Sequence, residues 1–554
     1  MRTFPSLNHT ISSTIESNLV QQIIGSKKAQ KTFTSWNRLD TQQFLDAYKS
    51  HSNIHHHYLS EQLNRIPEKG ASIILANHPT GISDAIVILE TILKVRSDIK
   101  LFIPDHKSIP APLSSFVIKH QDQQVHERSN DKKKAFGICK SYLEKGQCLV
   151  IFTSSKVLLD KKTHKRNQEA FWNPLVKELL TIHKGPVIPW AIKGKNSPIF
   201  YPLSKVHPLI HTGLIPRESL HRRFRPLYSS IGKPFKFKDD QTFNDVELKI
   251  RLMTSPQPNI IWPKLKFKAK SQPIIQETPA SSLEEEISLL ESPLITKGDH
   301  AIYITKASKS PQLIREIGRL REISFRKVKE GTGKEIDLDT YDKDFHHLIL
   351  WDHNANCIVG AYRLGLGPEL HSGGSYHSIL YDFYRKNEKN SELLRSTLVM
   401  GRAFVRPEYQ QKIFPLFMLW QGIKIFVKQH PKICYLIGQT SLPHSYKDYS
   451  KLLICQFMWR HHSDIDIRKH FVPYHPLRIR PNNLINQWIE ESKPEDFKRM
   501  DSIIECIEPS GDKLPMLFRR YIEQNAKCIG INIDPEFQNS VDILMLTRVE
   551  DIPE

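Results

Sequence analysis

Residues 75–88 read LANHPTGISDAIVI, in which one apolar run passes through a Gly-containing turn into a second apolar run. A buried strand followed by an apolar helix is the unit from which α/β sheets are built. Two more short apolar runs, QCLVIF at 147–152 and GPVIPWAI at 185–192, alternate with polar, helix-forming segments. We therefore expect an α/β domain whose buried strands pair in parallel.

The turn within this stretch carries His78 and Asp84, six positions apart. A hydroxyl group that attacks a thioester needs a base, and histidine fills that role near neutral pH when an acidic group orients its ring. Ligands of open α/β sheets also bind at strand ends. The pattern predicts His78 as the base and Asp84 as its orienting partner, with an ordinary surface turn as the alternative.

Length and composition narrow the class of protein. The chain has 554 residues, more than one hydrophobic core usually organises, so we expect two large domains. Its hydrophobic fraction of 39% and charged fraction of 25% exclude a wholly disordered chain. Seven scattered cysteines without a C-x-x-C pair favour a reducing, cytoplasmic compartment. We expect no metal and no cofactor.

The charge balance is strongly basic, with 79 Lys and Arg against 59 Asp and Glu, a net charge of +20 with histidine neutral. Such a surface attracts nucleic acid, anionic lipid headgroups or acidic proteins. No apolar stretch approaches the roughly 20 residues that span a bilayer. The longest, 413–423, is followed by Lys424 and predicts a buried core helix, so any membrane contact is expected to be peripheral.

The clearest change in composition lies at 263–298, where alternating lysines lead into a Pro- and Ser-containing stretch and an acidic, helix-like segment. We interpret it as a linker between domains at 1–262 and 299–554. Beyond it, a helical segment precedes two strand-like runs, HHLILWD and CIVGAYRL, separated by a turn at 353–356. Further strand-like runs flank an amphipathic segment at 416–429, which suits an α+β domain.

The first domain shows a family resemblance. NHPTGISDAIVI resembles the NHP-x-G-x-x-D block of the lysophospholipid acyltransferase-like domains found with hemolysin-like proteins, and HERSNDKKKAF (126–136) and GPVIPWAIKGKNSPIFYPLS (185–204) resemble two further blocks. The resemblance implies a glycerolphosphate-acyltransferase-like α/β fold and transfer of an acyl chain to a hydroxyl group. It implies His78 and Asp84 as the catalytic pair, and Asn77 and Arg128 as substrate-binding residues.

One block departs from that family. Where the family reads F-P-E-G or F-P-A-G-E, this chain has Phe152, Thr153, Ser154, Ser155 and Lys156. In the family this loop helps hold the polar head of the acceptor, so Ser155 and Lys156 become the substrate-binding candidates. Either the acceptor differs or the site is weak. Lys156 binds an anion directly or is a solvated lysine.

The second domain shows another resemblance, to the GNAT-like N-acyltransferase domain of ornithine-lipid and related amino-acid-lipid synthases. It rests on YDKDFHHLILWD (341–352), IVGAYRLG (358–365), GRAFVRPEYQQKIFPLFMLWQGI (401–423), YLIGQTSLP (435–443) and a closing block at 514–546. In that family an acyl carrier protein delivers a 3-hydroxy fatty acid to the amino group of a small amino acid. No R-x-x-G-x-G/A loop of the kind that cradles coenzyme A follows GRAFVRPEYQ, which favours acyl carrier protein over acyl-CoA as donor.

Two arginines are the substrate-binding candidates of the second domain. Arg363 and Arg402 stand in the family's Y-R-L and E-x-G-R words. Each either pairs with a carboxylate or phosphate of the substrate or forms a salt bridge inside the domain. Val399 occupies the position of the family's Glu and cannot accept a proton, so the chain reads as a diverged member.

Two further clusters are weaker signals. The basic and aromatic segment HRRFRPLYSSIGKPFKFK (221–238) suits an anionic membrane surface, with nucleobase stacking or a solvated face as alternatives. The histidines of HSNIHHHY (51–58) lack cysteines or carboxylates at metal-ligand spacing, so we expect no metal there.

Together these features predict a cytoplasmic acyltransferase, peripheral on the inner face of the cell membrane, that moves acyl chains from acyl carrier protein or acyl-CoA to a lipid acceptor. By resemblance, N-acylation followed by O-acylation yields an amino-acid-containing lipid. The alternatives are a lysophospholipid or glycerophospholipid acyltransferase with one active domain, and a non-catalytic lipid-surface binding protein with decayed sites. No nucleic-acid partner is expected.

Overall fold

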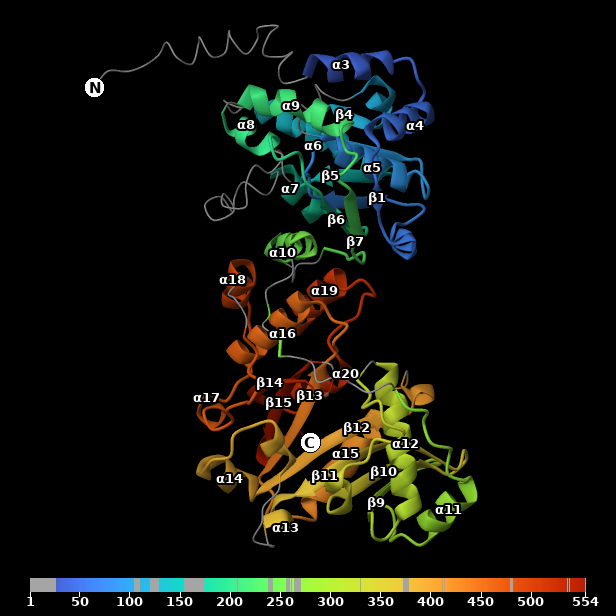
Figure 1. The fold of residues 1–554 in the computed structure, drawn as a ribbon, viewed down its shortest axis with the longest axis vertical. Coiled ribbons are helices and arrows are strands. Elements are labelled where there is room, and N and C mark those ends of the chain that lie inside the picture. The colour runs from blue at the N-terminus through green and yellow to red at the C-terminus, as the bar shows by residue number, and fades with distance from the viewer. Residues whose placement is uncertain are drawn as a thin grey trace, which may run out of the picture. The chain divides into compact units, whose positions relative to one another are not determined.

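The chain folds into two compact units, each described here by itself (Figure 1). The computed structural model describes residues 26–553 except 104–109, 120–128, 154–173, 207, 238–242, 256–259, 261, 264–270, 329, 372–377, 411, 413, 479–481, 536 and 538. The described residues of Met1–Pro256 and Lys498–Lys513 form the N-terminal unit. Those of Gln257–Phe497 and Leu514–Glu554 form the C-terminal unit.

A seven-stranded sheet forms the centre of the described part of the N-terminal unit, in the order β1-β7-β6-β2-β5-β3-β4. Its strands are β1 (His56–His57), β2 (Ser72–Ala76), β3 (Ile99–Ile103), β4 (Val117–Lys119), β5 (Cys148–Phe152), β6 (Val187–Lys193) and β7 (Leu227–Ile231). Within this sheet, β6 and β7 are antiparallel and the other neighbours are parallel. The expected α/β sheet and its buried strands are confirmed.

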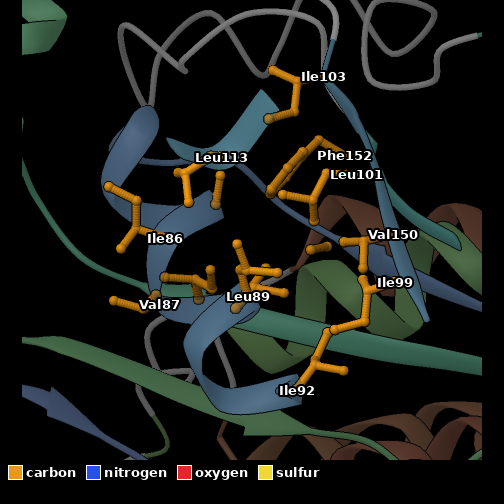
Figure 2. Packing of buried hydrophobic residues seen from close by; sticks show 14 of the residues in the cluster. Ile86, Val87, Leu89, Ile92, Ile99, Leu101, Ile103, Leu113, Val150 and Phe152 are labelled. Atoms are coloured by element: carbon orange, nitrogen blue, oxygen red, sulfur yellow. The ribbon is translucent and has the colours of Figure 1, made fainter. Parts of the chain in front are cut away.

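Each central strand sends alternate side chains into two separate cores. In β2, Ile74 enters one core and Ile73 the other. The first core is covered by α3 (Ser26–Ser35), α4 (Thr41–Ser52) and α5 (Ile82–Ile92), and the second by α6 (Ser129–Glu144), α7 (Pro174–Ile182) and α10 (Phe243–Thr254). Figure 2 shows Leu89 of α5 on the side of the helix toward Leu101 and Val150 of the sheet. Burial on both faces explains why these strands read as unbroken apolar runs.

Two helices connect β6 to β7, α8 (Phe200–Val206) and α9 (Pro208–Leu220). The loop before α8 and the loop after α9 are held together by Glu218 of α9. This carboxylate accepts hydrogen bonds from the backbone and the hydroxyl of Ser197, both at 2.6 Å, and pairs with Arg225. Gly194 in the first loop lies close to Thr80 of the turn that carries His78 and to Arg222 of the second loop, so both loops adjoin this turn.

Helix α19 (Phe497–Ile507) packs in the N-terminal unit from Lys498 onward, although it lies late in the sequence. Arg499 donates to both carboxylate oxygens of the buried Asp245 on α10, at 2.9 and 3.1 Å. Lys249 donates to the hydroxyl of Ser502 at 2.7 Å, and burial lowers the pKa of this lysine to about 8. The division of the sequence at 263–298 assigned this helix to the second domain. Its apolar periodicity is that of any amphipathic helix and does not show which unit it packs in.

The described part of the C-terminal unit holds an eight-stranded sheet in the order β14-β15-β13-β12-β11-β10-β9-β8. Its strands are β8 (Ile295–Lys297), β9 (His300–Lys306), β10 (His346–Asp352), β11 (Cys357–Leu366), β12 (Thr397–Val405), β13 (Tyr435–Leu442), β14 (Lys527–Asp534) and β15 (Ser540–Arg548). In this sheet β12 and β13 run parallel, and the other neighbours are antiparallel. The expected α+β architecture and the hairpin around 353–356 are confirmed.

Helices cover both faces of this sheet. Ile349 of β10 packs in a core with α12 (Pro311–Lys327), whereas the adjacent Leu348 lies against Gly422 of α15 (Phe414–Lys428). Neighbouring strand residues point to opposite faces, so α12 and α15 lie on opposite sides of the sheet. The other helices are α11 (Ala280–Ser288), α13 (Gly367–His371), α14 (Glu388–Leu394), α16 (Asp448–His461), α17 (Ile465–Arg468), α18 (Asn483–Glu491) and α20 (Met516–Glu523).

Residues 271–298 of the stretch interpreted as a linker belong to the C-terminal unit. Leu283 and Ile287 on α11 are buried in the same core as α12, and β8 pairs with β9. These two apolar residues lie four positions apart in an otherwise acidic segment, which is the spacing of one helix face. From Phe414 onward the apolar run expected at 413–423 lies in α15, where Met418, Leu419 and Ile423 are buried and Phe417 is exposed. Within the described ranges no helix is long and apolar enough to cross a membrane.

Candidate functional site

The first candidate site is the turn between β2 and α5. Gly81 adopts φ 87°, a left-handed conformation that glycine reaches without strain, and the helix starts directly after it. Asp84, in the first helical turn, is fully buried and accepts hydrogen bonds from Thr80 N (2.7 Å), Thr80 Oγ1 (2.5 Å) and Gly81 N (2.9 Å). His78 Nδ1 lies 3.3 Å from Asp84 Oδ2. The turn therefore brings the two predicted catalytic residues together.

The contact between His78 and Asp84 is an approach rather than a finished hydrogen bond. The distance suits an ion pair, yet Nδ1 makes no hydrogen bond of good geometry to any described residue. The ring centroid of His78 lies 4.4 Å from that of Phe152 on β5, which limits its movement. Catalytic hydrogen bonds are often long before substrate binds.

Of the other candidate residues of the first domain, the structure describes Asn77 and not Arg128, Ser155 or Lys156. Asn77 is buried and exchanges two hydrogen bonds with the backbone of Ile192, so in this structure it ties β2 to β6. Arg128, Ser155 and Lys156 lie outside the described residues, as does most of the loop that departs from the family pattern. The predicted roles of these three residues stay predictions.

The basic and aromatic segment 221–238 does not form one continuous surface. Arg222 is fully buried, Phe235 and Phe237 pack against the second core, and Lys233 pairs with Glu505. Phe224 is 84% exposed, with the guanidinium of Arg223 over its ring. The fold therefore uses part of the cluster that the sequence suggested for membrane binding, while Arg223, Phe224 and Tyr228 are exposed.

The second candidate site lies where β12 and β13 separate. The two parallel strands pair from Thr397 and Tyr435 to Met400 and Gly438. Beyond that point β12 keeps only β11 and β13 keeps only β15 as partner among the described strands. A cavity of about 220 Å³ opens at the separation. It is lined by both strands and by Glu330, Tyr362, Tyr521, Asp534 and Asp542, among others.

Two carboxyl groups of this cavity bind protons unusually tightly. Burial raises the pKa of Glu330 to about 7. Burial, and then the negative charge of Asp534, raise the pKa of Asp542 to about 8, against hydrogen bonds from Ser441 and Ser540. A carboxylate that titrates near the working pH is suited to accept a proton during catalysis.

The lining of the cavity also includes buried polar atoms that make no hydrogen bond to the described residues. Within the part of the chain that the structure describes, Glu330 Oε1, Tyr362 Oη and Gln439 Nε2 are buried and make no hydrogen bond. Gly438 leaves space for Tyr521, because a Cβ at this glycine would lie 1.8 Å from the phenol oxygen. Buried polar groups without partners are costly, so these atoms favour binding of a polar ligand in the cavity.

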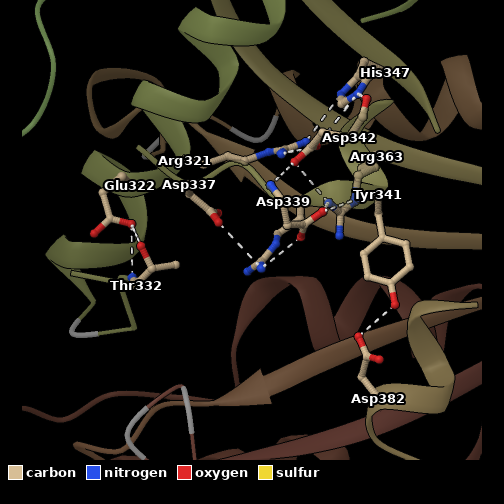
Figure 3. Close-up of polar contacts among 11 residues, drawn as sticks. Arg321, Glu322, Thr332, Asp337, Asp339, Tyr341, Asp342, His347, Arg363 and Asp382 are labelled. Atoms are coloured by element: carbon tan, nitrogen blue, oxygen red, sulfur yellow. Dashed lines mark hydrogen bonds and ion pairs between the residues drawn. The ribbon is translucent and has the colours of Figure 1, made fainter. Parts of the chain in front are cut away.

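Arg363 is the centre of a buried ionic network (Figure 3). Its Nη1 lies 2.6 Å from Asp339 Oδ1 and 3.3 Å from Asp342 Oδ2. Arg321 binds the other oxygen of Asp342 at 2.7 Å, and His347 Nε2 donates to the backbone oxygen of Asp342 at 3.0 Å. Burial alone raises the pKa of Asp342, but the two arginines outweigh it and hold the pKa well below its usual value. The internal salt bridge predicted for Arg363 is observed, and its predicted role in substrate binding stays a prediction, with Arg363 lining the cavity.

Arg402 has longer ion-pair contacts than Arg363. The backbone of Arg402 is left-handed, with φ 50°, at a register shift between β11 and β12. Its Nη2 lies 3.6 Å from Asp337 and 3.5 Å from Asp339, and its guanidinium stacks 5.0 Å from the ring centroid of Phe537. The side chain is 19% exposed and lines the cavity. Backbone strain in a non-glycine residue beside a cavity is typical of a functional position.

Sequence reasoning did not identify Glu330 and Asp542. Asp542 carries a detectable signal, because it is the one charged residue in the apolar run SVDILML at 540–546. Glu330 follows α12 in a polar stretch and has no such signal. Val399, at the position of the family's Glu, is buried and lines the cavity, so the carboxylates reach the same space from β15 and from the end of α12.

Comparison with known proteins finds a family match in the C-terminal unit and two similar enzymes. The family described as an acetyltransferase (GNAT) domain matches residues 320–421. The chain is 30% identical over 298 residues to a glycine N(alpha)-acyltransferase of Phocaeicola vulgatus, covering 51% of this chain and 89% of that protein. It is 29% identical over 300 residues to a glycine N(alpha)-acyltransferase of Bacteroides thetaiotaomicron, covering 51% of this chain and 86% of that protein.

Among solved structures, a CoA-dependent acyl-homoserine lactone synthase, BjaI, is 12% identical and has a TM-score of 0.19, covering 35% of this chain and 88% of that one. At this TM-score the likeness carries no argument. The expected GNAT-like acyltransferase domain is confirmed by the family match. The resemblances to lysophospholipid acyltransferase-like domains and to ornithine-lipid synthases stay predictions.

Proposed function

This chain belongs, through its C-terminal half, to the family of GNAT acyltransferases that includes the glycine N(alpha)-acyltransferases, and from this premise we propose that its C-terminal unit acylates the amino group of a small amino acid. The acyl donor is a thioester, carried by acyl carrier protein or coenzyme A. The product is an N-acyl amino acid with a free carboxylate. The observation that carries the proposal is the pair of proton-accepting carboxylates in the cavity between β12 and β13.

The chemistry needs such a group. An amino acid at neutral pH carries an ammonium, which has no lone pair to attack a carbonyl. Asp542, with a pKa of about 8, takes one proton from this ammonium when it is itself ionised. The amine nitrogen then forms a bond to the thioester carbonyl carbon, the carbon–sulfur bond breaks, and the thiol leaves with a proton. Glu330 lies in the same cavity and supports the same proton transfer.

The geometry also suits the rest of the acceptor and the donor. Arg402 presents a partly exposed cation to the cavity, which favours binding of the amino acid's carboxylate. Past Met400 and Gly438, the facing edges of β12 and β13 are no longer paired with each other. Backbone donors and acceptors freed in this way can bind an extended acyl-carrying arm.

The test is a reaction of the full chain with glycine and a 3-hydroxyacyl thioester. We expect an N-acylglycine, detected by mass spectrometry, together with free thiol. Acyl-CoA and acyl carrier protein donors are compared side by side, and other small amino acids are offered in place of glycine. Failure of a folded chain to acylate any amino acid from either donor would contradict the proposal.

A second function is favoured by the geometry at His78. In the proposed second step, His78 removes the proton from the 3-hydroxyl of the N-acyl amino acid, with Asp84 orienting its ring. The oxygen then attacks a second thioester and the thiol leaves. The buried Asp84 and its three hydrogen bonds support this role. A chain with His78→Ala is expected to accumulate the N-acyl product without the ester.

We further propose that the protein works at the inner membrane face, since the product of two acylations is a lipid. The support is the net charge of +20 and the exposed Phe224 beside Arg223. Flotation with vesicles of anionic or zwitterionic lipid tests this. Equal recovery with and without anionic lipid would contradict it.

A further inference from the structure

The N-terminal unit contains a buried arginine, Arg222, that has no part in the proton transfer proposed for His78 and Asp84. Arg222 follows α9 and is 0% exposed. Its backbone N–H binds Ser52 O at 3.0 Å, which fixes the residue in the fold. No described carboxylate lies within ion-pair distance of its guanidinium. A buried charge without a close counter-charge is expensive, so such an arrangement needs a reason.

The guanidinium is also short of hydrogen-bond acceptors. Nη1 donates to Asn196 Oδ1 at 3.1 Å. Nε and Nη2 have no acceptor among the residues that the structure describes. Asn196 is 3% exposed, and its Nδ2, which bears two more hydrogens, is unsatisfied in the same way. Every unsatisfied atom of this pair is a donor.

The pair lies beside the catalytic turn. Gly194 has no side chain, and a Cβ placed there would lie 3.5 Å from Arg222 Nη2 and 3.1 Å from Thr80 Cγ2. Thr80 in turn holds Asp84 through its backbone and its hydroxyl. Burial lowers the pKa of Arg222, and Asp84 is the strongest of the charges that oppose this. The unsatisfied donors are therefore next to the group that orients His78.

We propose that Arg222 and Asn196 form the receptor for an anionic oxygen of the acceptor that is acylated at His78. A group of donors with one positive charge and no acceptor is complementary to a carboxylate or a phosphate. The inference rests on the proposed O-acyl transfer and names the chemistry of its acceptor. The N-acyl amino acid made by the C-terminal unit carries such a carboxylate, and a phosphate-bearing lysolipid carries the alternative anion.

Asn196→Asp is the most informative variant. The new carboxylate would lie where Nη1 of Arg222 already donates, so it would pair with the arginine and occupy the receptor from within. We expect the melting temperature to rise by several degrees and binding of the external anion to weaken at least tenfold. A role limited to packing predicts the rise in melting temperature without any loss of binding.

Binding is measured calorimetrically on the full chain, without turnover, using N-octanoylglycine, its uncharged analogue N-octanoylglycinamide, and inorganic phosphate. We expect an anionic probe to bind the wild type at least tenfold more tightly than it binds Arg222→Met or Asn196→Asp. If the variants weaken the binding of N-octanoylglycine, the acceptor carries a carboxylate. If they weaken the binding of inorganic phosphate, the acceptor carries a phosphate. The matched control is Arg223→Met, which removes the neighbouring exposed arginine and is expected to leave the binding of these three soluble probes unchanged in the absence of membranes.

Two results would overturn the receptor. One is unchanged binding of both anions in a folded Asn196→Asp chain, and the other is equal binding of N-octanoylglycine and the glycinamide with no response to phosphate. Both are independent of catalysis. A chain that binds anions through Arg222 but never forms an ester would contradict the proposed second step alone. N-acylation by the C-terminal unit is expected to be unaffected in every variant.

Discussion

The two candidate sites treat their buried carboxyl groups in opposite ways. In the N-terminal unit, Asp84 accepts three hydrogen bonds from its own turn and has one rigid orientation. In the C-terminal unit, burial dominates around Glu330 and Asp542, so their pKa values rise to about 7 and about 8. The first arrangement suits a group that orients a base, and the second suits a group that is the base. The hydrogen-bond donors and the burial around a carboxyl group thus decide which of these two roles it suits.

The strongest test of this contrast is Asp84→Asn. An amide cannot accept from Thr80 and Gly81 as a carboxylate does, and it presents the wrong partner to the His78 ring. We expect O-acyl transfer to fall about 1000-fold, in the range seen when the orienting acid of a catalytic histidine is lost. The measurement is the rate of ester formation from purified N-acyl amino acid. N-acyl transfer by the same preparation serves as the control, and parallel loss of both activities would point to misfolding.

Asp542→Asn addresses the other side of the contrast. N-acyl transfer at pH 7 is expected to fall about 100-fold, because the proton acceptor is removed. In the wild type the rate should rise as the pH passes through about 8, where Asp542 loses its proton, and the variant should lose this rise. Rates measured from pH 6 to 9.5 with saturating thioester check both points. A variant with the wild-type pH profile would assign the proton transfer elsewhere.

Glu330→Gln separates the two carboxylates of the cavity. If Glu330 supports the transfer rather than performing it, N-acyl transfer should fall only about tenfold at pH 7. Removal of its negative charge should also lower the pKa of Asp542, since Glu330 is one of the charges that raise it. The pH at which the rate rises would then shift downward. A loss larger than that of Asp542→Asn would reverse the assignment of the two roles.

The smallest effect concerns stability. A carboxyl group whose folded pKa is raised stabilises the fold at low pH, and that contribution is lost as the pH rises through the folded value. For Asp542 the loss occurs up to about pH 8. Asp542→Asn should therefore melt a few degrees higher than the wild type at pH 9 and no higher at pH 4. Thermal denaturation at the two pH values measures this, and a variant that is less stable at pH 9 would argue that the burial is compensated by the surrounding structure.

Much of the fold was predictable because it depends on local patterns. The turn around His78, the central strands β2, β5 and β6, the β10–β11 hairpin and the helix α15 all follow from apolar runs with punctuating glycines and polar residues. The His78–Asp84 contact was predictable for the same reason, since both residues belong to one strand–turn–helix unit.

The remaining features depend on contacts between distant segments. Asp542 and Glu330 meet at one cavity from positions more than 200 residues apart in the sequence, and no local pattern shows that the strand pairing of β12 and β13 ends after Met400. Arg222 belongs to a run of basic residues that looks like a surface, yet the packing between α9 and β7 buries it. Helix α19 likewise lies late in the sequence but packs in the N-terminal unit, and no local pattern indicates this.

The placement of α19 has a consequence for how the chain is made. Because Arg499 and Ser502 supply partners to the buried Asp245 and Lys249, the N-terminal unit is complete only when residues 498–513 have been synthesised. By then the ribosome has already produced most of the C-terminal unit. A nascent chain must therefore hold its first unit unfinished for over 200 residues, and a truncation after residue 295 leaves that unit without its final helix.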